Sequence, residues 1–214
     1  MIIAPHSDDE VIGCGGTVRK LVQRGAGVEV MIVTGGKSGV QEEGAETRKK
    51  EAQEAAKILG VNRLSFLDFD DGDIRPAARL KQELRDKIEG VRPDIVFAPN
   101  IFDNHPDHVI IGNQLVASAN DCSVEFQCYF FEVWTPLVAN VVVDISNEIE
   151  IKIQAMKAHQ SQQAKTEFVE MIQSINRYRA IACLSGKPSM KYAEAFFRVC
   201  KKDMATLKPF LRQN

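Results

Sequence analysis

The sequence has no excess of basic residues, no paired-cysteine motif and no long apolar run. Its 27 Lys+Arg and 29 Asp+Glu residues give a formal net charge of -2. That balance lacks the basic footprint of nucleic-acid-binding proteins, which argues against nucleic acid as a partner. The five cysteines are scattered and never form a Cys-x-x-Cys pair, which argues against a disulfide framework and a thiolate zinc cage. No segment approaches the roughly 20 apolar residues of a membrane span.

The first residues leave no room for a targeting segment. Residues 1–4, Met-Ile-Ile-Ala, lead directly into Pro5 and His6, which predicts a chain without a signal peptide and a reducing, cytoplasmic location. A length of 214 residues fits one medium-sized domain. No internal repeat, low-complexity stretch or Pro/Ser-rich linker marks a boundary. We therefore expect a single domain over residues 1–214.

Short apolar runs alternate with helix-length segments along most of the chain. The runs lie at 2–4, 28–34, 64–67, 94–99 and 125–131. Helical apolar spacing fills the segments 11–22, 44–59 and 77–88 between them. This alternation is typical of a parallel sheet with crossover helices. The expected fold class is α/β, a Rossmann-like and mostly parallel sheet flanked by helices.

The pattern changes after Trp134. Residues 138–143 predict a strand, and the apolar spacing that begins at Ile145 predicts a long helix that ends near Leu184. The run 192–199 predicts a last strand.

Two polar stretches follow predicted strands: residues 5–10, Pro-His-Ser-Asp-Asp-Glu, and residues 104–108, Asn-His-Pro-Asp-His. Ligands bind at the carboxyl ends of parallel strands, and a switch in strand order would bring these stretches face to face. Two imidazoles and one carboxylate, with coordination left open for water, suit a catalytic divalent metal. We therefore predict a metal-dependent hydrolase with His6, Asp9 and His108 as ligands.

Asp8 lies beside this set without belonging to it. A carboxylate next to a bound metal suits a general base for an activated water molecule. The structural alternative is that Asp8 and Asp9 are only helix N-terminal acids, and that residues 105–108 are only a capped turn. The occurrence of both stretches after two different strands favours the metal site.

Arg48 extends the apolar stripe of the segment 44–59 and lies near the same edge of the sheet. A cation on the buried side of a helix needs a partner. We therefore expect Arg48 to reach substrate, or to pair with Asp8 or Glu51. The alternative is a simple helical salt bridge with Glu51.

These stretches resemble the motifs of the LmbE-like or PIG-L-type zinc N-deacetylases, which remove acetyl from N-acetylglucosamine-bearing substrates. The family's Pro-His-Pro-Asp-Asp-Glu stands at residues 5–10, where Ser7 in place of proline is the one departure. Ser7 lies between ligands, so the metal chemistry should be unaffected. The remaining matches follow in chain order: a Thr-x-Arg-x-x-Glu-like helix start at 47–51, His-Pro-Asp-His at 105–108, His-x-Ser-Gln at 159–162 and Tyr-Ala-Glu-Ala-Phe at 192–196.

The resemblance implies Zn²⁺ as cofactor, with Fe²⁺ or another divalent metal as the alternative. It implies the ligands and the base argued above, and it adds a role for His105, which when protonated would stabilise the tetrahedral intermediate. Asp107 would orient the His105 ring. His159 would contact substrate, unless it is a satisfied core histidine. Independently of the resemblance, Trp134 follows the last strand of the predicted parallel set. That position would offer a stacking face for a sugar ring, unless the side chain packs in the core.

The expected function is therefore zinc-dependent hydrolysis of the N-acetyl group of an N-acetylglucosamine-type sugar or glycoconjugate by metal-activated water. The expected partner is a small amino-sugar substrate, with a homo-oligomer left open. One rival is a metal-dependent hydrolase of a phosphoester or another amide, since the same ligands suit iron or manganese. Another is a non-catalytic sugar- or nucleotide-binding protein, since a fold does not supply function by itself. The presence of both Asp8 and His105 argues against simple binding.

Overall fold

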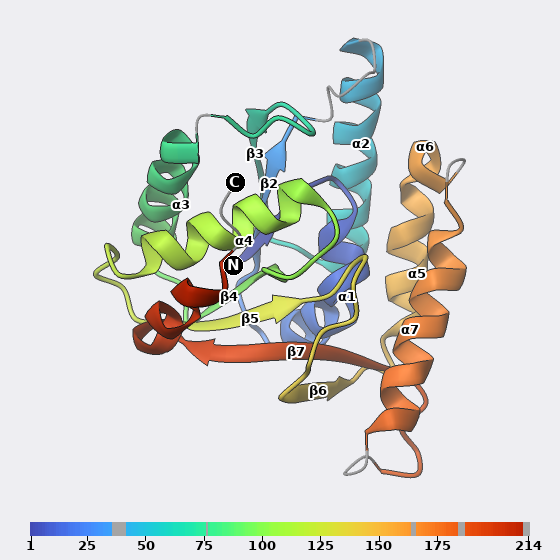
Figure 1. Ribbon diagram of the computed structural model, residues 1–214. Helices are drawn as coiled ribbons and strands as arrows, with labels where there is room; N and C mark the ends of the chain where they lie inside the picture. The colour runs from blue at the N-terminus through green and yellow to red at the C-terminus, as the bar shows by residue number, and fades with distance from the viewer. Residues whose placement is uncertain (36–41, 76, 164–165, 184–186, 212–214) are drawn as a thin grey trace.

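One sheet joins all the strands of the computed structural model, which describes residues 1–35, 42–75, 77–163, 166–183 and 187–211 (Figure 1). The strands are β1 (Ile2–Ala4), β2 (Glu29–Thr34), β3 (Arg63–Phe69), β4 (Ile95–Pro99), β5 (Gln127–Phe131), β6 (Val141–Asp144) and β7 (Ala193–Cys200). Their order is β3-β2-β1-β4-β5-β7-β6. The pairs from β3 to β5 are parallel, whereas β7 is antiparallel to both β5 and β6. The predicted α/β fold with a mostly parallel sheet is confirmed.

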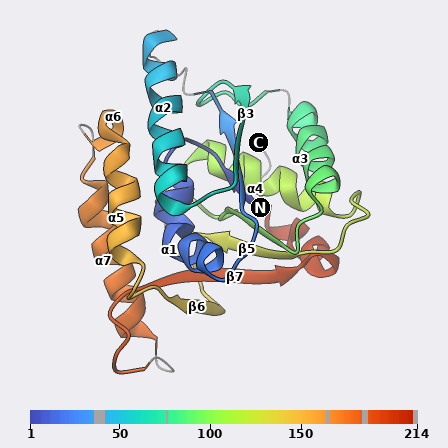
Figure 2. The ribbon, with the colours of Figure 1, turned by 180° about the vertical axis from the view of Figure 1, so that it is seen from behind.

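Helices cover both faces of this sheet (Figures 1 and 2). They are α1 (Asp9–Gln23), α2 (Glu42–Leu59), α3 (Ala77–Val91), α4 (Pro106–Ala119), α5 (Ile149–Ala158), α6 (Gln160–Gln163), α7 (Phe168–Ala182) and the 3-10 helix η1 (Lys201–Phe210). One apolar core packs α3, α4 and η1 against one face, and a second packs α1, α2, α5 and α7 against the other. No helix in the described ranges is long and apolar enough to cross a membrane.

The strand order reverses beside β1. The chain runs outward from β1 through β2 to β3, then returns across the sheet to place β4 on the other side of β1, where Ile2 pairs with Phe97. Since β1 and β4 are parallel neighbours, the loops that follow them leave the same edge of the sheet side by side. The expected strand-order switch is therefore present, and it is what brings the two polar stretches together.

The predicted long helix from Ile145 to about Leu184 is wrong, because the described residues of that segment form the separate helices α5, α6 and α7. The backbone leaves helical geometry at His159 (φ -81°, ψ 60°) and again at Glu167 (φ -76°, ψ 60°), and Leu184 lies outside the described residues. The apolar spacing of α5 is genuine, but the polar run that follows it, residues 159–163, has no apolar side chain that would continue the stripe. Ile145 stays outside α5, because its N–H donates to the carbonyl of Tyr192 at 2.9 Å. The predicted last strand is confirmed as β7.

Glycine lets α1 lie close against the sheet. A Cβ atom on Gly13 would lie 2.2 Å from Cδ2 of Phe131 on β5, so a larger residue must push the helix or the ring away. We expect Gly13→Ala to lower the free energy of unfolding by roughly 1–3 kcal/mol. Gly27→Ala is the matched control, because a Cβ atom there meets nothing within 4 Å. Equal denaturant midpoints for the two variants would contradict the close packing of α1.

Candidate active site

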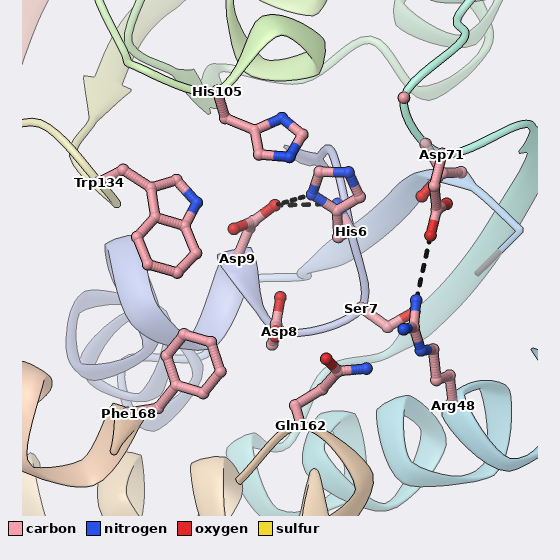
Figure 3. Close-up of a pocket in the computed structure, with 12 residues that line it drawn as sticks. His6, Ser7, Asp8, Asp9, Arg48, Asp71, His105, Trp134, Gln162 and Phe168 are labelled. Atoms are coloured by element: carbon pink, nitrogen blue, oxygen red, sulfur yellow. Dashed lines mark hydrogen bonds and ion pairs between the residues drawn. The ribbon is translucent and has the colours of Figure 1, made fainter. Parts of the chain in front are cut away.

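Three potential ligand atoms converge where the loops after β1 and β4 meet. Nδ1 of His6 and Nε2 of His108 each lie 3.1 Å from Oδ2 of Asp9, and the two nitrogens lie 3.4 Å apart. Ligands at about 2.0–2.1 Å from a tetrahedral zinc ion are separated by roughly 3.3 Å. The donor set therefore fits a divalent metal without rearrangement. Figure 3 shows His6 and Asp9 turned toward each other at the centre of this site.

The electrostatics of these groups also favour a cation. Burial by itself would lower the pKa of His6, but Asp107 and Asp9 outweigh it and raise that pKa to about 10. Burial opposes the charged form of His108 as well, and Asp9 and Asp103 raise its pKa to about 9. Burial would raise the pKa of Asp9, yet the two histidines hold it below its ordinary range. Carboxylates thus draw positive charge into this site.

Asp8 is buried beside the ligands, with its carboxylate in the same cavity (Figure 3). It stands at the N-cap of α1 but makes no capping hydrogen bond, and its carboxylate pairs with no other described residue. Burial, and then the negative charge of Asp9, raise its pKa above the ordinary range. The helix-cap explanation for Asp8 is therefore not supported. A carboxylate that holds a proton more readily suits general acid-base work.

His105 caps α4 with its ring. Its Nδ1 accepts the backbone N–H of Asp107 at 3.2 Å, so the neutral ring carries its proton on Nε2. Burial, followed by the nearby histidines, lowers the pKa of His105. The expectation of a protonated His105 is therefore not supported, although neutral His105 still offers an N–H donor. Its ligand atom lies within 4.8 Å of those of His6 and His108, whereas Oδ2 of Asp9 lies 3.1 Å from both.

The carboxylate of Asp107 contacts a different histidine from the one expected. Its Oδ2 lies 3.0 Å from Nε2 of His6 and accepts the N–H of Gly72 at 2.8 Å. A ligating histidine is commonly oriented through its second nitrogen in this way. The expected contact of this carboxylate with His105 is therefore wrong, and Asp107 orients His6.

A cavity of about 270 Å³ opens from the three-ligand site. Trp134, with 42% of its surface exposed, lines one wall and packs against Phe168 with 5.8 Å between ring centroids. The opposite wall is polar: Nη1 of Arg48 donates to Oδ2 of Asp71 at 3.0 Å, and Gln162 lies nearby (Figure 3). The cavity therefore offers an aromatic face and a hydrogen-bonding face on either side of the candidate ligands.

Two expected contacts take a different form. Arg48 lines the cavity but pairs with Asp71, not with Asp8 or Glu51. The carboxylate of Glu51 instead accepts the backbone N–H and the hydroxyl of Ser161, at 2.8 and 2.6 Å. This pairing fixes α6, which carries Gln162, against α2.

His159 lies outside the cavity and is fully buried. Neither ring nitrogen has a hydrogen-bond partner in the described part of the chain, and burial lowers the pKa of His159 to about 4. The expected substrate contact is wrong for this side chain, because no solvent-accessible surface remains for it. Gln162, three residues later in the same motif, lines the cavity in its place.

Sequence reasoning missed Asp71, Gln162 and Asp103. Asp71 follows β3 at the same edge of the sheet as the two polar stretches, so the rule that located those stretches applies to it as well. Gln162 belongs to the motif at residues 159–162, in which only His159 was predicted to contact substrate. Asp103 precedes the second stretch by one residue, and only its contacts reveal it.

The fold and the site together are those of an α/β protein that gathers two histidines and a carboxylate at a strand-order switch, beside a second carboxylate that pairs with none of the described residues. Residues 1–119 match the family model described as PIG-L: GlcNAc-PI de-N-acetylase, which is more than half of the chain. The chain belongs to the PIG-L family, and the resemblance stated from its motifs is confirmed.

Several relatives of the chain are deacetylases of N-acetylated sugars or their conjugates. The diacetylchitobiose deacetylase of Thermococcus kodakarensis is 30% identical, over 76% of this chain and 69% of the relative. The solved N,N'-diacetylchitobiose deacetylase of Pyrococcus horikoshii is 26% identical with a TM-score of 0.79, over 94% of this chain and 84% of that one. The 4-carboxy-2-hydroxymuconate hydratase of Pseudomonas putida reaches the same TM-score at 19% identity, over 92% and 94% of the two chains. The fold alone therefore does not define the reaction.

Proposed function

We propose that the chain hydrolyses the acetamide of an N-acetylglucosamine-type sugar or glycoconjugate at a divalent metal held by His6, Asp9 and His108. The observation that carries the proposal is the convergence of three ligand atoms within 3.1 to 3.4 Å of one another, beside the carboxylate of Asp8, for which the described ranges supply no hydrogen-bond or ion-pair partner. Two imidazoles and a carboxylate suit zinc, and Fe²⁺ is the alternative metal. The deacetylase relatives support the choice of bond and of sugar.

A bound metal ion would supply positive charge that polarises a carbonyl group and lowers the pKa of a water molecule. Asp8 accepts the proton of the attacking water, and Nε2–H of His105 donates to the oxygen that becomes negatively charged. Asp8 then returns the proton to the departing amine, so one carboxylate serves both steps. Asp107 orients His6 throughout.

The two walls of the cavity would hold the sugar. Arg48 and Asp71 present a donor and an acceptor to hydroxyl groups, while Trp134 offers a flat apolar face to a pyranose ring. These charges largely cancel, since Arg48 is paired with Asp71. The arrangement favours a neutral sugar ring over a charged group at this wall.

The test is a panel of N-acetylated sugars, including N,N'-diacetylchitobiose, assayed for released primary amine and acetate. We expect release that a chelator abolishes and that added Zn²⁺ restores, with Fe²⁺ and Mn²⁺ compared in parallel. Phosphate release from generic phosphoesters is measured under the same conditions. Metal-dependent phosphate release without amine release would replace the proposal by the phosphoesterase alternative.

A further inference from the structure

Asp103 is a fully buried carboxylate in the loop between β4 and α4, and three elements of the site meet on it. Its Oδ1 accepts the backbone N–H of His105 at 3.0 Å. Its Oδ2 accepts the backbone N–H of Trp134 at 3.3 Å and lies 3.6 Å from Nδ1 of His108. The same side chain therefore contacts the candidate ligand His108, the N–H donor His105 and the backbone of Trp134. We call the cavity face formed by Trp134 and Phe168 the aromatic wall.

His108 needs an acceptor at this position. Its Nε2 faces Asp9, so a neutral ring that used Nε2 as a ligand would carry its proton on Nδ1. Nδ1 is buried and hydrogen-bonds to nothing in the described ranges, although a buried N–H normally has an acceptor. Oδ2 of Asp103 faces it at the outer limit of ion-pair contact, and a shift of a few tenths of an ångström would close a hydrogen bond.

The aromatic wall has a second anchor that does not touch the histidines. Nε of Arg179 on α7 donates to Oε1 of Glu132 at 2.9 Å, and Oε2 of Glu132 accepts the N–H of Leu137 at 2.9 Å. Glu132 thus holds the two ends of the loop that carries Trp134. Asp103 ties the middle of that loop to the candidate metal site.

We infer that Asp103 is a positioning residue, which fixes His108 as the Nδ1–H tautomer for a bound metal ion and holds the Trp134 wall in register with it. The inference rests on the proposed metal site. Carboxylate partners of ligating histidines commonly contribute about 10- to 100-fold to metal affinity. An exclusively structural residue would contribute to folding stability and leave that affinity unchanged.

The experiment measures Zn²⁺ affinity of the metal-free protein by competition with a chromogenic chelator. Asp103→Asn keeps the shape of the side chain and removes its charge. Asp144→Asn is the matched control, because Asp144, the last residue of β6, likewise accepts a backbone N–H, that of Ser146 at 2.9 Å. Trp134 is the only tryptophan of the chain, so acrylamide quenching of its fluorescence reports directly on the aromatic wall.

We expect Asp103→Asn to bind Zn²⁺ about 10- to 100-fold more weakly and to show stronger quenching, with neither change in Asp144→Asn. Asp103→Glu keeps the charge on a longer chain and serves where the Asn variant does not fold, with a smaller loss expected. Wild-type Zn²⁺ affinity in the variant that folds overturns the inference, even if its unfolding temperature falls. A His108→Ala variant that binds Zn²⁺ like the wild type removes the proposed metal site, and the inference with it.

Discussion

Asp8→Asn is expected to lower kcat for acetamide hydrolysis by about 10²- to 10⁴-fold while Zn²⁺ still binds with one equivalent. Asparagine has the shape of the carboxylate but cannot take the proton of the attacking water. The three ligand atoms come from other residues, so the metal site should persist. The measurements are steady-state kinetics on the best substrate of the sugar panel and elemental analysis of the purified variant.

Stability separates this role of Asp8 from a structural one. The Asp8 carboxylate pairs with no described residue, and its burial beside Asp9 disfavours the charged form. The unfolding temperature of metal-free Asp8→Asn should therefore match or exceed that of the wild type. A capping role would instead cost about 1 kcal/mol.

Asp71→Asn is the matched control for charge, since it removes one carboxylate from the same cavity. Asp71 is proposed to bind hydroxyl groups, so we expect this change to act mainly on KM. Full activity in Asp8→Asn would refute its assignment as the base. An equal loss of kcat in both variants would show that the loss of negative charge in the cavity, and not the loss of proton transfer, lowers kcat.

The position of the three candidate ligands could be predicted from local sequence patterns, because two local rules apply there. Apolar runs located β1 and β4, and residues that directly follow parallel strands share one edge of the sheet. His6, Asp9 and His108 all lie in the loop or first helical turn after one of these strands. The sequence alone did not give the strand order that makes β1 and β4 neighbours, and a single reversal of that order beside β1 produces it.

The wrong expectations concern partners that lie far apart in the sequence. Asp107 could be assigned to His105 by proximity, yet the carboxylate of a first-turn residue can also point across to another loop, and it reaches His6, 101 residues away. Arg48 likewise pairs with Asp71, 23 residues later, and not with Glu51 on its own helix. Spacing along one helix reports which side chains share a face. It does not report what the next element brings to that face.

The break at His159 shows a second limit. Apolar periodicity predicts that a helix buries one of its faces. It does not report the tertiary hydrogen bonds that a polar run can make instead of continuing the helix. The backbone N–H and the hydroxyl of Ser161 both donate to the carboxylate of Glu51 on α2. This contact depends on α2 being packed against α5. The turn that brings Gln162 into the cavity is thus determined by tertiary structure.

Lys152→Met is expected to lower the free energy of unfolding by about 3–5 kcal/mol, the largest stability effect we predict. Lys152 is fully buried, and its Nζ donates to Oε1 of Glu194 at 2.6 Å, to Oδ1 of Asn176 at 2.9 Å and to the carbonyl of Ile12 at 2.7 Å. Glu194 also accepts the N–H of Gly16 at 2.8 Å. The lysine therefore links α5, α7 and β7 to the middle of α1.

Removing the lysine alone leaves the Glu194 carboxylate buried without its cation, which is why the loss should be large. Adding Glu194→Gln removes the unpaired charge, so the double variant should recover part of the loss, with a coupling energy of roughly 0.5–3 kcal/mol. Lys57→Met is the control, because its pair with Glu54 is exposed, and it should change stability by less than about 1 kcal/mol. Denaturant titrations of Lys152→Met, of Glu194→Gln alone and of the double variant complete a double-mutant cycle. Strictly additive losses would show that the two residues stabilise the chain independently. Since α1 begins at Asp9, the same ion pair holds in place the helix that presents the candidate base and one candidate ligand.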